Sequence, residues 1–439
     1  MTHKSVWDRG RARRVAAGAL VALSAATLSA CGDDGGNGTP QLTWYINNAA
    51  QEPLATACNE QAEGAYNITA SLLPNNAAGQ REQILRRLAA EDKTVDIVSI
   101  DPPYMPELAN AGFLREFTEE EREEFSEGVL RGPLEQAIYE DTMFSAPFYG
   151  NTQLLWYKKS VAEEAGLDME NPVTWDQIIE AAEQTGTTVA VQGRRNESLM
   201  VWVNALVESA GGKILDEDSE GAEAEDVEAA ISSEAGAEAA RIMNAIAASE
   251  VSPPALSTAG EEESRAAFQA ENGGFMVNWP YVWSAFDAAV EGGALPEDFK
   301  DDVAWTRYPQ VVEGEESATP LGGIGLSVGA YSANPDAAVE AVRCLRSPES
   351  QKEYMMTAGD PGASEEIYDD PEIQEQFPMF AEIREGLTDA APRPISPYYG
   401  DVTGAIQEGY HPPRSLSPER TPDATASLIE GVLSNDQLL

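Results

Sequence analysis

Apolar and polar positions alternate along the first half of the chain in units of strand and helix length. Residues 41–46 (QLTWYI) and 67–73 (NITASLL) have the length and composition of strands, and residues 53–64 lie between them as a helix. The stretch 79–92 places leucine and isoleucine on one side and arginine on another, which predicts an amphipathic helix. Residues 95–100 (VDIVSI) form a run typical of a buried parallel strand. This order predicts an α/β fold.

The second half continues the alternation. Further strands are expected over 153–157, 274–278 and 322–328, and further helices over 105–112, 161–166, 198–209, 234–247 and 335–346, with another helix starting at Thr174. The acidic run 216–228 is expected to be a solvated loop or helix face rather than a metal site. About 400 residues exceed what one core usually supports, so two domains are expected.

The first thirty residues have the pattern of an export signal. Five basic side chains precede an apolar run, residues 15–28, that is too short for a comfortable membrane span. The run ends in LSAC, and Cys31 is followed by the flexible GDDGGNG. This resembles the lipobox of bacterial lipoproteins, in which the cysteine becomes the lipidated first residue. An ordinary cleaved signal with a chance cysteine is the alternative. The mature chain is expected on the outer face of a membrane, held by a lipid.

Charge changes the set of possible partners. The chain has 28 Lys and Arg against 75 Asp and Glu; without residues 1–30, 23 basic and 74 acidic residues remain, a net charge of −51. Nucleic acid and anionic lipid headgroups would be repelled by such a chain. A hydrophobic content of 42% still supports a real core.

Catalytic chemistry finds little support in the sequence. His411 is the only histidine after residue 30, which argues against Ser-His-Asp, Cys-His and zinc sites, and no metal or cofactor is expected. Residues 325–329 (GLSVG) match the pattern of a nucleophile elbow, but five residues separate them from the next helix, at Pro335, so the match is accidental. A glycoside hydrolase stays open as an alternative, because two carboxylates could come from anywhere among 74. A chaperone or adhesin lipoprotein that binds proteins also stays open.

Several stretches, taken together and in this order, resemble the extracellular solute-binding proteins (family 1) of ATP-driven (ABC) sugar importers. These stretches are 95–114 (VDIVSIDPPYMPELANAGFL), 146–179, 267–283 (AFQAENGGFMVNWPYVW) and 320–328. Three shorter ones are similar to the branch that includes trehalose-binding lipoproteins of Gram-positive bacteria: 151–153 (NTQ), 278–281 (NWPY) and 393–399 (RPISPYY).

The resemblance implies a two-lobed periplasmic-binding-protein-like α/β fold with a ligand cleft between the lobes. After a signal peptide over 1–30 and a lipidated tether over 31–40, the first lobe would take 41–149 plus 305–349 and the second 150–304 plus 350–439. Cys58 and Cys344 would then lie in helices of one lobe, and an extracellular location favours a disulfide between them.

The implied function is capture, not catalysis. The lobes would close on a di- or oligosaccharide, with trehalose first and other α-glucosides such as maltose behind it, and the closed form would deliver the sugar to the membrane permease. A monomer is expected.

A sugar site combines aromatic rings with side chains that hydrogen-bond two hydroxyls at once. Candidates are residues at strand ends, where α/β clefts collect their ligands. They are Asn47, Asn48, Asp101, Asn151, Glu261, Glu262, Trp279, Tyr281, Gly323 and Arg393. Trp279 is expected to be the ring on which the sugar stacks.

Most candidates also have a structural interpretation. Asp101 could cap the next helix, and Asn151 could be a turn residue. Glu261 and Glu262 could be charges that stabilise a helix N-terminus, and Arg393 could pair with any carboxylate. Four other tryptophans are assigned to the core or its rim: Trp156, Trp175, Trp202 and Trp283.

Overall fold

The structure is a computed structural model that describes residues 38–216, 219 and 221–439. The expected signal peptide and the lipidation site at Cys31 lie outside the described residues, as do three positions of the acidic run, 217, 218 and 220. Among the helices that the structure describes, none has the length and apolar character needed to cross a membrane.

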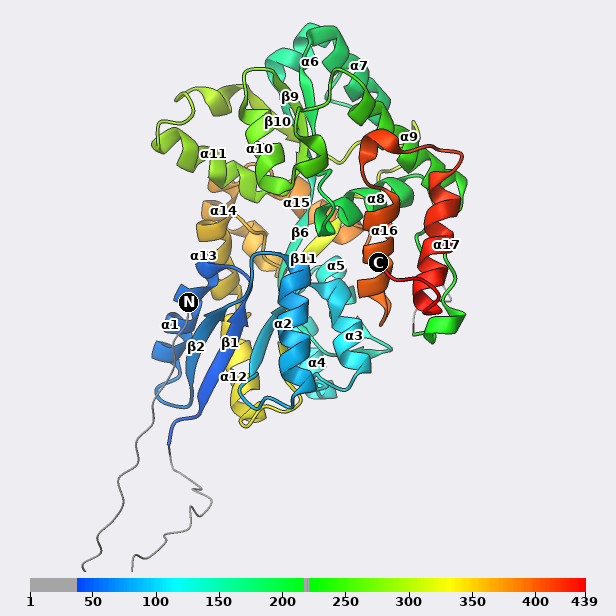
Figure 1. Cartoon of the computed structure of the whole chain (residues 1–439). Coiled ribbons are helices and arrows are strands. Elements are labelled where there is room, and N and C mark those ends of the chain that lie inside the picture. The colour runs from blue at the N-terminus through cyan, green and yellow to red at the C-terminus, as the bar shows by residue number, and fades with distance from the viewer. Residues whose placement is uncertain (1–37, 217–218, 220) are drawn as a thin grey trace, which may run out of the picture. The chain divides into compact units, whose positions relative to one another are not determined.

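The first sheet has five strands in the order β2-β1-β3-β11-β6 (Figure 1). β1 pairs in parallel with both β2 and β3, whereas β11 runs antiparallel to β3 and β6. The strands are β1 (Gln41–Ile46), β2 (Asn67–Leu72), β3 (Ile97–Ile100), β6 (Ala146–Thr152) and β11 (Leu321–Val328). The helices around this sheet include α1 (Glu52–Gln61), α2 (Ala77–Ala89), α3 (Met105–Asn110), α4 (Glu119–Ser126), α5 (Arg131–Glu135) and α12 (Pro335–Leu345). The sheet is thus completed by a strand from far along the chain.

The second sheet has four strands in the order β10-β7-β9-β8. The strands are β7 (Leu154–Lys158), β8 (Thr188–Ala190), β9 (Gly273–Asn278) and β10 (Val303–Thr306). The helices after β7 and before β10 are α6 (Lys159–Ala165), α7 (Trp175–Thr185), α8 (Glu197–Ser209), α9 (Glu234–Ala248), α10 (Glu261–Gln269) and α11 (Tyr281–Glu291). Four tryptophans assigned to packing lie in the cores: Trp156, Trp175 and Trp202 are fully buried and Trp283 is 9% exposed.

Helix boundaries follow local chemistry. The α7 helix begins after Thr174, whose hydroxyl accepts from the Gln177 amide while the Gln177 side chain accepts from the Thr174 amide, a capping box. It ends at Gly186, which adopts φ 66°, a conformation that glycine reaches without strain. The α2 helix is capped by the side chain of Asn76, which accepts from the amide of Gly79.

The chain crosses between the sheets several times. Only Gln153 separates β6 in the first sheet from β7 in the second. The return runs from β10 to β11, and because β10 pairs with β7 through Thr306 it begins after that residue rather than at 305. β6 extends the first sheet to Thr152, beyond the expected boundary at 149.

The C-terminal segment contacts both sheets. It contains α13 (Pro348–Ala358), α14 (Pro371–Gln376), α15 (Phe380–Asp389), α16 (Tyr399–Gly409) and α17 (Thr421–Leu433). Tyr354 of α13 belongs to the buried core of the first sheet, whereas Tyr399 of α16 belongs to the same buried cluster as Trp175 and Trp202, near the second. The residues after 349 therefore do not belong to one lobe alone.

A disulfide joins Cys58 of α1 to Cys344 of α12, with 5.8 Å between the Cα atoms and a sequence separation of 286. It ties the returning part of the chain to the first sheet.

Candidate functional site

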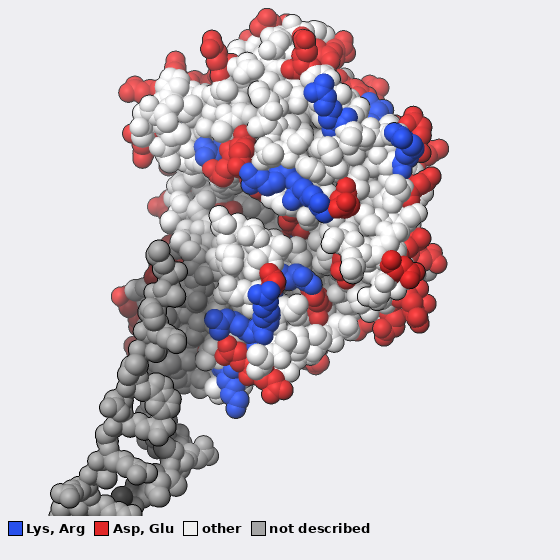
Figure 2. All heavy atoms as spheres, in the orientation of Figure 1, with Lys and Arg blue, Asp and Glu red and all other residues white. Residues whose placement is uncertain are grey.

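A cavity of about 790 Å³ lies between residues of the two sheets. Figure 2 shows the corresponding hollow on one face of the molecule, between the region of α2 and that of α8 and α10, with basic side chains along its border. Its lining includes eight of the ten residues expected at the ligand site: Asn47, Asp101, Asn151, Glu261, Glu262, Trp279, Gly323 and Arg393. The cavity size is that of a small-molecule site.

Two of the expected residues, Asn48 and Tyr281, are not among the residues that line this cavity. The Asn48 side chain accepts a hydrogen bond from the amide of Ala50 (3.0 Å) and caps a short 3-10 helix. The Tyr281 hydroxyl donates to Glu262 (2.6 Å) at the start of α11. Both side chains are engaged by their own neighbourhood.

Trp279 is positioned by the end of β9. Its backbone amide donates to the Asn278 side chain (2.9 Å), and the Asn278 amide group donates in turn to Ser264 (3.0 Å) and to the backbone oxygen of Glu261 (3.0 Å). The ring reaches across to β11, where a Cβ atom on Gly322 would lie 3.0 Å from its Cη2. An aromatic ring from one lobe thus lies against a bare stretch of backbone in the other.

Gly323, beside Gly322, holds β11 close to β6. It adopts φ 131°, and a Cβ there would come 2.3 Å from the backbone oxygen of Tyr149. Any other residue would be strained and would push the two strands apart. A close approach of the backbone was expected at this position. It occurs within the fold, between Gly323 of β11 and Tyr149 of β6.

Arg393 forms a buried ionic cluster with two carboxylates. Its guanidinium donates to both oxygens of Asp101, at 2.6 and 3.3 Å, and to Glu197 at 2.6 Å. Only 5% of Arg393 is exposed. Burial opposes its charge, yet Asp101, Tyr399 and Glu197 raise the pKa of Arg393 well above its ordinary value. Burial raises the pKa of Asp101, while the nearby guanidinium opposes that rise.

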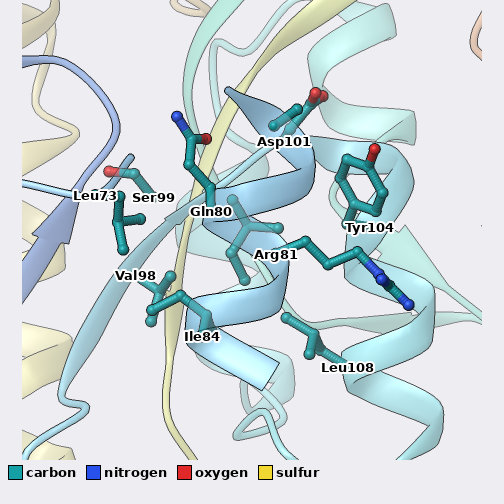
Figure 3. A pocket seen from close by; sticks show the side chains of 11 residues that line it. Leu73, Gln80, Arg81, Ile84, Val98, Ser99, Asp101, Tyr104 and Leu108 are labelled. Carbon is teal, nitrogen blue, oxygen red and sulfur yellow. The ribbon is translucent and has the colours of Figure 1, made fainter. Parts of the chain in front are cut away.

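The cluster decides between the two interpretations of its members. Asp101 makes no capping hydrogen bond to the helix that follows it, so the capping alternative is wrong. Pairing with a carboxylate, the structural alternative for Arg393, is what the structure has. In Figure 3, Asp101 and Tyr104 lie near the end of α2 that carries Gln80, beside a smaller cavity of about 20 Å³ that both help to line.

Glu197 was not expected from the sequence and is a centre of this cluster. Besides Arg393, its carboxylate accepts from the hydroxyls of Tyr104 (2.9 Å), Thr403 (2.9 Å) and Tyr399. Burial first, then Glu197, raises the pKa of Tyr104 and of Tyr399, so both phenols keep the proton that they donate. These donors come from two regions of the chain that are distant from Glu197 in sequence, one at Tyr104 and one between Arg393 and Thr403, so no local sequence pattern predicts them.

Glu261 and Glu262 stand at the N-terminus of α10 and also line the cavity. Glu261 accepts from the hydroxyl of Ser198 (2.8 Å). Glu262 pairs with Arg265 (2.5 Å), and although burial opposes ionisation, the hydrogen bonds from Arg265 and Tyr281 lower the pKa of Glu262. Both the helix-terminal and the site interpretation therefore fit the same positions.

Asn151 lies inside β6, not in a turn. Its Oδ1 accepts from the amide of Thr152 (3.1 Å) and its Nδ2 donates to Asp360 (3.2 Å). Close by, Asn47 donates to the hydroxyl of Tyr149 (3.2 Å), a second cavity-lining residue that sequence reasoning missed.

The side chains that line the cavity can form hydrogen bonds and an aromatic contact with a polar ligand. They offer amide, carboxylate and hydroxyl groups beside one indole ring. The serine of the GLSVG stretch, Ser327, is fully buried within β11. Among the described residues, no group of three or more His, Cys, Asp and Glu side chains is arranged to hold a metal ion.

The chain is similar to several known proteins. The family model described as bacterial extracellular solute-binding protein matches residues 43–352. A probable ABC transporter-binding protein of Deinococcus radiodurans is 25% identical over 309 residues, which cover 66% of this chain and 68% of that protein.

Solved structures share the fold. The maltose-bound MalE3 of T. maritima is 24% identical and covers 89% of this chain and 99% of its own, with a TM-score of 0.77. The GacH receptor of Streptomyces glaucescens, solved alone and with acarbose, is 18% identical and covers 91% of this chain and 100% of its own, with a TM-score of 0.73. The fold is the two-lobed α/β fold of these binding proteins, and, since the family model spans most of the described residues, the chain belongs to the bacterial extracellular solute-binding proteins.

Proposed function

We propose that this protein is the sugar-capturing component of an ABC importer, and that it binds a disaccharide in the cavity beside Trp279. The observation that carries the proposal is the position of the Trp279 ring against Gly322, at the edge of a cavity of about 790 Å³ rich in amides and carboxylates. The weakly apolar face of a sugar ring packs on an aromatic ring, and its hydroxyls need donors and acceptors around the edge.

The polar lining suits a neutral ligand. The arginines at the cavity are already paired: Arg393 with Asp101 and Glu197, Arg194 with Glu263, and Arg195 with Glu408. A phosphate or another anion would have to break one of these pairs and would meet further carboxylates. The cavity therefore favours hydroxyl groups over anionic ones.

Capture would proceed by hinge closure. Ligand groups contacting residues of both lobes stabilise the closed form over the open one, because those contacts exist together only when the lobes are near. The segments between β6 and β7 and between β10 and β11 are the crossings about which the lobes would turn. The protein binds the sugar without changing it and delivers it to the permease in the membrane.

Trehalose is the first candidate ligand, because the stretches 151–153, 278–281 and 393–399 resemble the trehalose-binding branch. Maltose and other α-glucosides follow, supported by the relation in fold to proteins described with maltose and with acarbose. A lipid on Cys31 would anchor the monomer to the outer face of the cytoplasmic membrane.

The test is the shift in melting temperature of the mature protein with a panel of trehalose, maltose, sucrose, cellobiose and a glycerophosphodiester. We expect at least one disaccharide to raise Tm and the glycerophosphodiester to leave it unchanged. A rise with the glycerophosphodiester alone would contradict the proposal. Mass spectrometry of the same sugars after incubation checks that none has been cleaved.

A further inference from the structure

A carboxylate outside the cavity lining holds one of the lining residues. Asp360 follows the end of α13, where Gly359 adopts φ 78°, and precedes Pro361. The backbone oxygen of Pro361 accepts from the amide of Gly150 (3.0 Å), which fixes this turn on the free edge of β6. The turn also abuts α11, because a Cβ on Gly359 would lie 3.0 Å from the Cα of Tyr281. Asp360 thus lies where the C-terminal segment, β6 and the start of α11 meet.

The carboxylate of Asp360 is satisfied by two neutral donors. Oδ1 accepts from Nδ2 of Asn151 at 3.2 Å, and Oδ2 accepts from the hydroxyl of Tyr354 at 3.0 Å. Among the ion pairs of the described residues, none involves Asp360. The titratable groups that interact with Asp360 are Tyr354 of α13 and Tyr149 of β6, and Tyr149 also interacts with Asp101. Burying a carboxylate without a neighbouring cation costs desolvation free energy. The position of Asp360 therefore suggests that this residue has a function.

The hydrogen bonds of Asn151 depend on the charge of Asp360. An ionised carboxylate only accepts, so Asn151 must direct its amide nitrogen to Asp360 and keep its oxygen for the Thr152 amide. One N–H and one lone pair of Asn151 then remain for a ligand in the cavity. A protonated Asp360 can donate its O–H to the Tyr354 hydroxyl, but its neutral carbonyl oxygen accepts the hydrogen bond from Asn151 more weakly than a carboxylate oxygen does. The Asn151 side chain is then held less firmly.

We propose that Asp360 is a positioning residue of the ligand site: its ionised carboxylate holds the Asn151 amide in the binding orientation, and its protonation weakens ligand binding. The inference rests on the proposed function, because it takes Asn151 as a ligand contact. Independently of that geometry, burial raises the pKa of Asp360 to about 6, so the change would fall in a mildly acidic range.

The first experiment measures affinity by calorimetry at pH 5.0 and 7.5, with whichever sugar of the panel binds. We expect wild type to bind about 3–10-fold more weakly at pH 5.0, the value of one hydrogen bond. Asp360→Asn, which can still accept from Asn151, should bind with nearly the same affinity at both pH values. Asp369→Asn, the same change on an exposed side chain of the neighbouring 3-10 helix, should keep the wild-type ratio. If the affinity ratio between pH 7.5 and pH 5.0 were the same in wild type and in Asp360→Asn, the inference would be overturned.

The second experiment needs no sugar. In the ligand-free protein, NMR follows the side-chain amide resonances of Asn151 from pH 4.5 to 8. We expect them to move with one midpoint near that of the Asp360 carboxyl, and to stay constant in Asp360→Asn. If the Asn151 resonances of wild type do not shift as Asp360 titrates, the inference is overturned even if sugar binding is confirmed. If the Asn151 resonances follow the Asp360 titration but no sugar binds, the link between Asp360 and Asn151 is supported and the proposed function is refuted.

Discussion

The ring of Trp279 lies against the backbone of Gly322, so that even one added methyl carbon would come within 3.0 Å of Cη2 and 3.2 Å of Cζ3. Gly322 is paired with Asn151 across β11 and β6, and all three residues line the same cavity. The position of the Trp279 ring, on which the sugar is proposed to stack, is thus fixed by a glycine of the opposite lobe.

Replacing Gly322 with alanine should move the Trp279 ring and weaken sugar binding while leaving the fold intact. The contact must open by a few tenths of an ångström, which a partly exposed ring can do. We expect an affinity loss of about 1 kcal/mol, within the range for displaced aromatic contacts. Calorimetry gives the affinity, and a melting curve of the same sample separates binding from stability. An affinity equal to wild type would mean that the ring position is unimportant.

Replacing Trp279 with alanine should cost about 1–3 kcal/mol of binding free energy, the scale of burying and stacking one aromatic ring. Tyr331→Ala is the matched control, because it removes a half-buried aromatic ring that packs on Phe113 and is not among the cavity-lining residues. We expect the control to bind as wild type does. Wild-type affinity for Trp279→Ala would remove the ring from the site.

Replacing Arg393 with methionine should destabilise the protein strongly. The change leaves Asp101 and Glu197 buried without their cation, which typically costs about 3–5 kcal/mol. Urea unfolding measures the loss. Arg384→Met is the control, since its partners Glu365 and Asp369 are exposed and a surface pair contributes about 0–1 kcal/mol. Equal, small losses for both variants would show that the Arg393 cluster is not a stabilising element.

The raised pKa of Asp360 predicts how the free energy of unfolding depends on pH. Burial raises the pKa of Asp360 from 3.8 to about 6 in the folded protein, so the folded state binds this proton more tightly than the unfolded state. The stability that the group contributes is therefore fully present below pH 3.8 and is lost as the pH rises to about 6.

Asp360→Asn lacks this titration, so its stability relative to wild type should increase between pH 4 and pH 7, by at most about 3 kcal/mol. Urea unfolding of both proteins across this range provides the measurement. A stability difference that stays constant, or that decreases with pH, would contradict the raised pKa of Asp360.

Removing the disulfide by replacing Cys58 and Cys344 with alanine should lower the free energy of unfolding by about 2–5 kcal/mol, because the bridge closes a very long loop. Intact-mass measurement with and without reductant checks that the bridge exists. Two freely alkylated thiols in the oxidised protein would contradict the pairing.

Local pattern was enough to predict most of the fold. Strands such as β1 and β11 and helices such as α2 and α12 were expected within a few residues of their bounds, because their apolar spacing and capping residues are local properties. The strand β6 was missed because its sequence, APFYGNT, contains proline and glycine and lacks alternation. Short strands such as β8 and β10 were missed because three or four residues carry too little pattern.

The residues that line the cavity were easiest to predict where they directly follow recognisable elements. Trp279 and Asp101 follow strands, and both line the cavity. Glu197 and Asp360 were missed because their partners lie far away in the sequence: Glu197 contacts residues near 104 and 400, and Asp360 contacts Asn151. The pattern also could not reveal that Arg393 would be paired with two carboxylates, since 74 acidic residues offer no preferred partner.

The most direct test of the proposed function is isothermal titration of the mature protein with trehalose and maltose, run beside Trp279→Ala and Tyr331→Ala. We predict saturable binding of at least one of these sugars at one site per chain, weakened in Trp279→Ala, unchanged in Tyr331→Ala, and with the sugar recovered intact. Three results would contradict the proposed function: equal binding in all three proteins, no binding of either sugar, or recovery of glucose from the calorimeter after the titration.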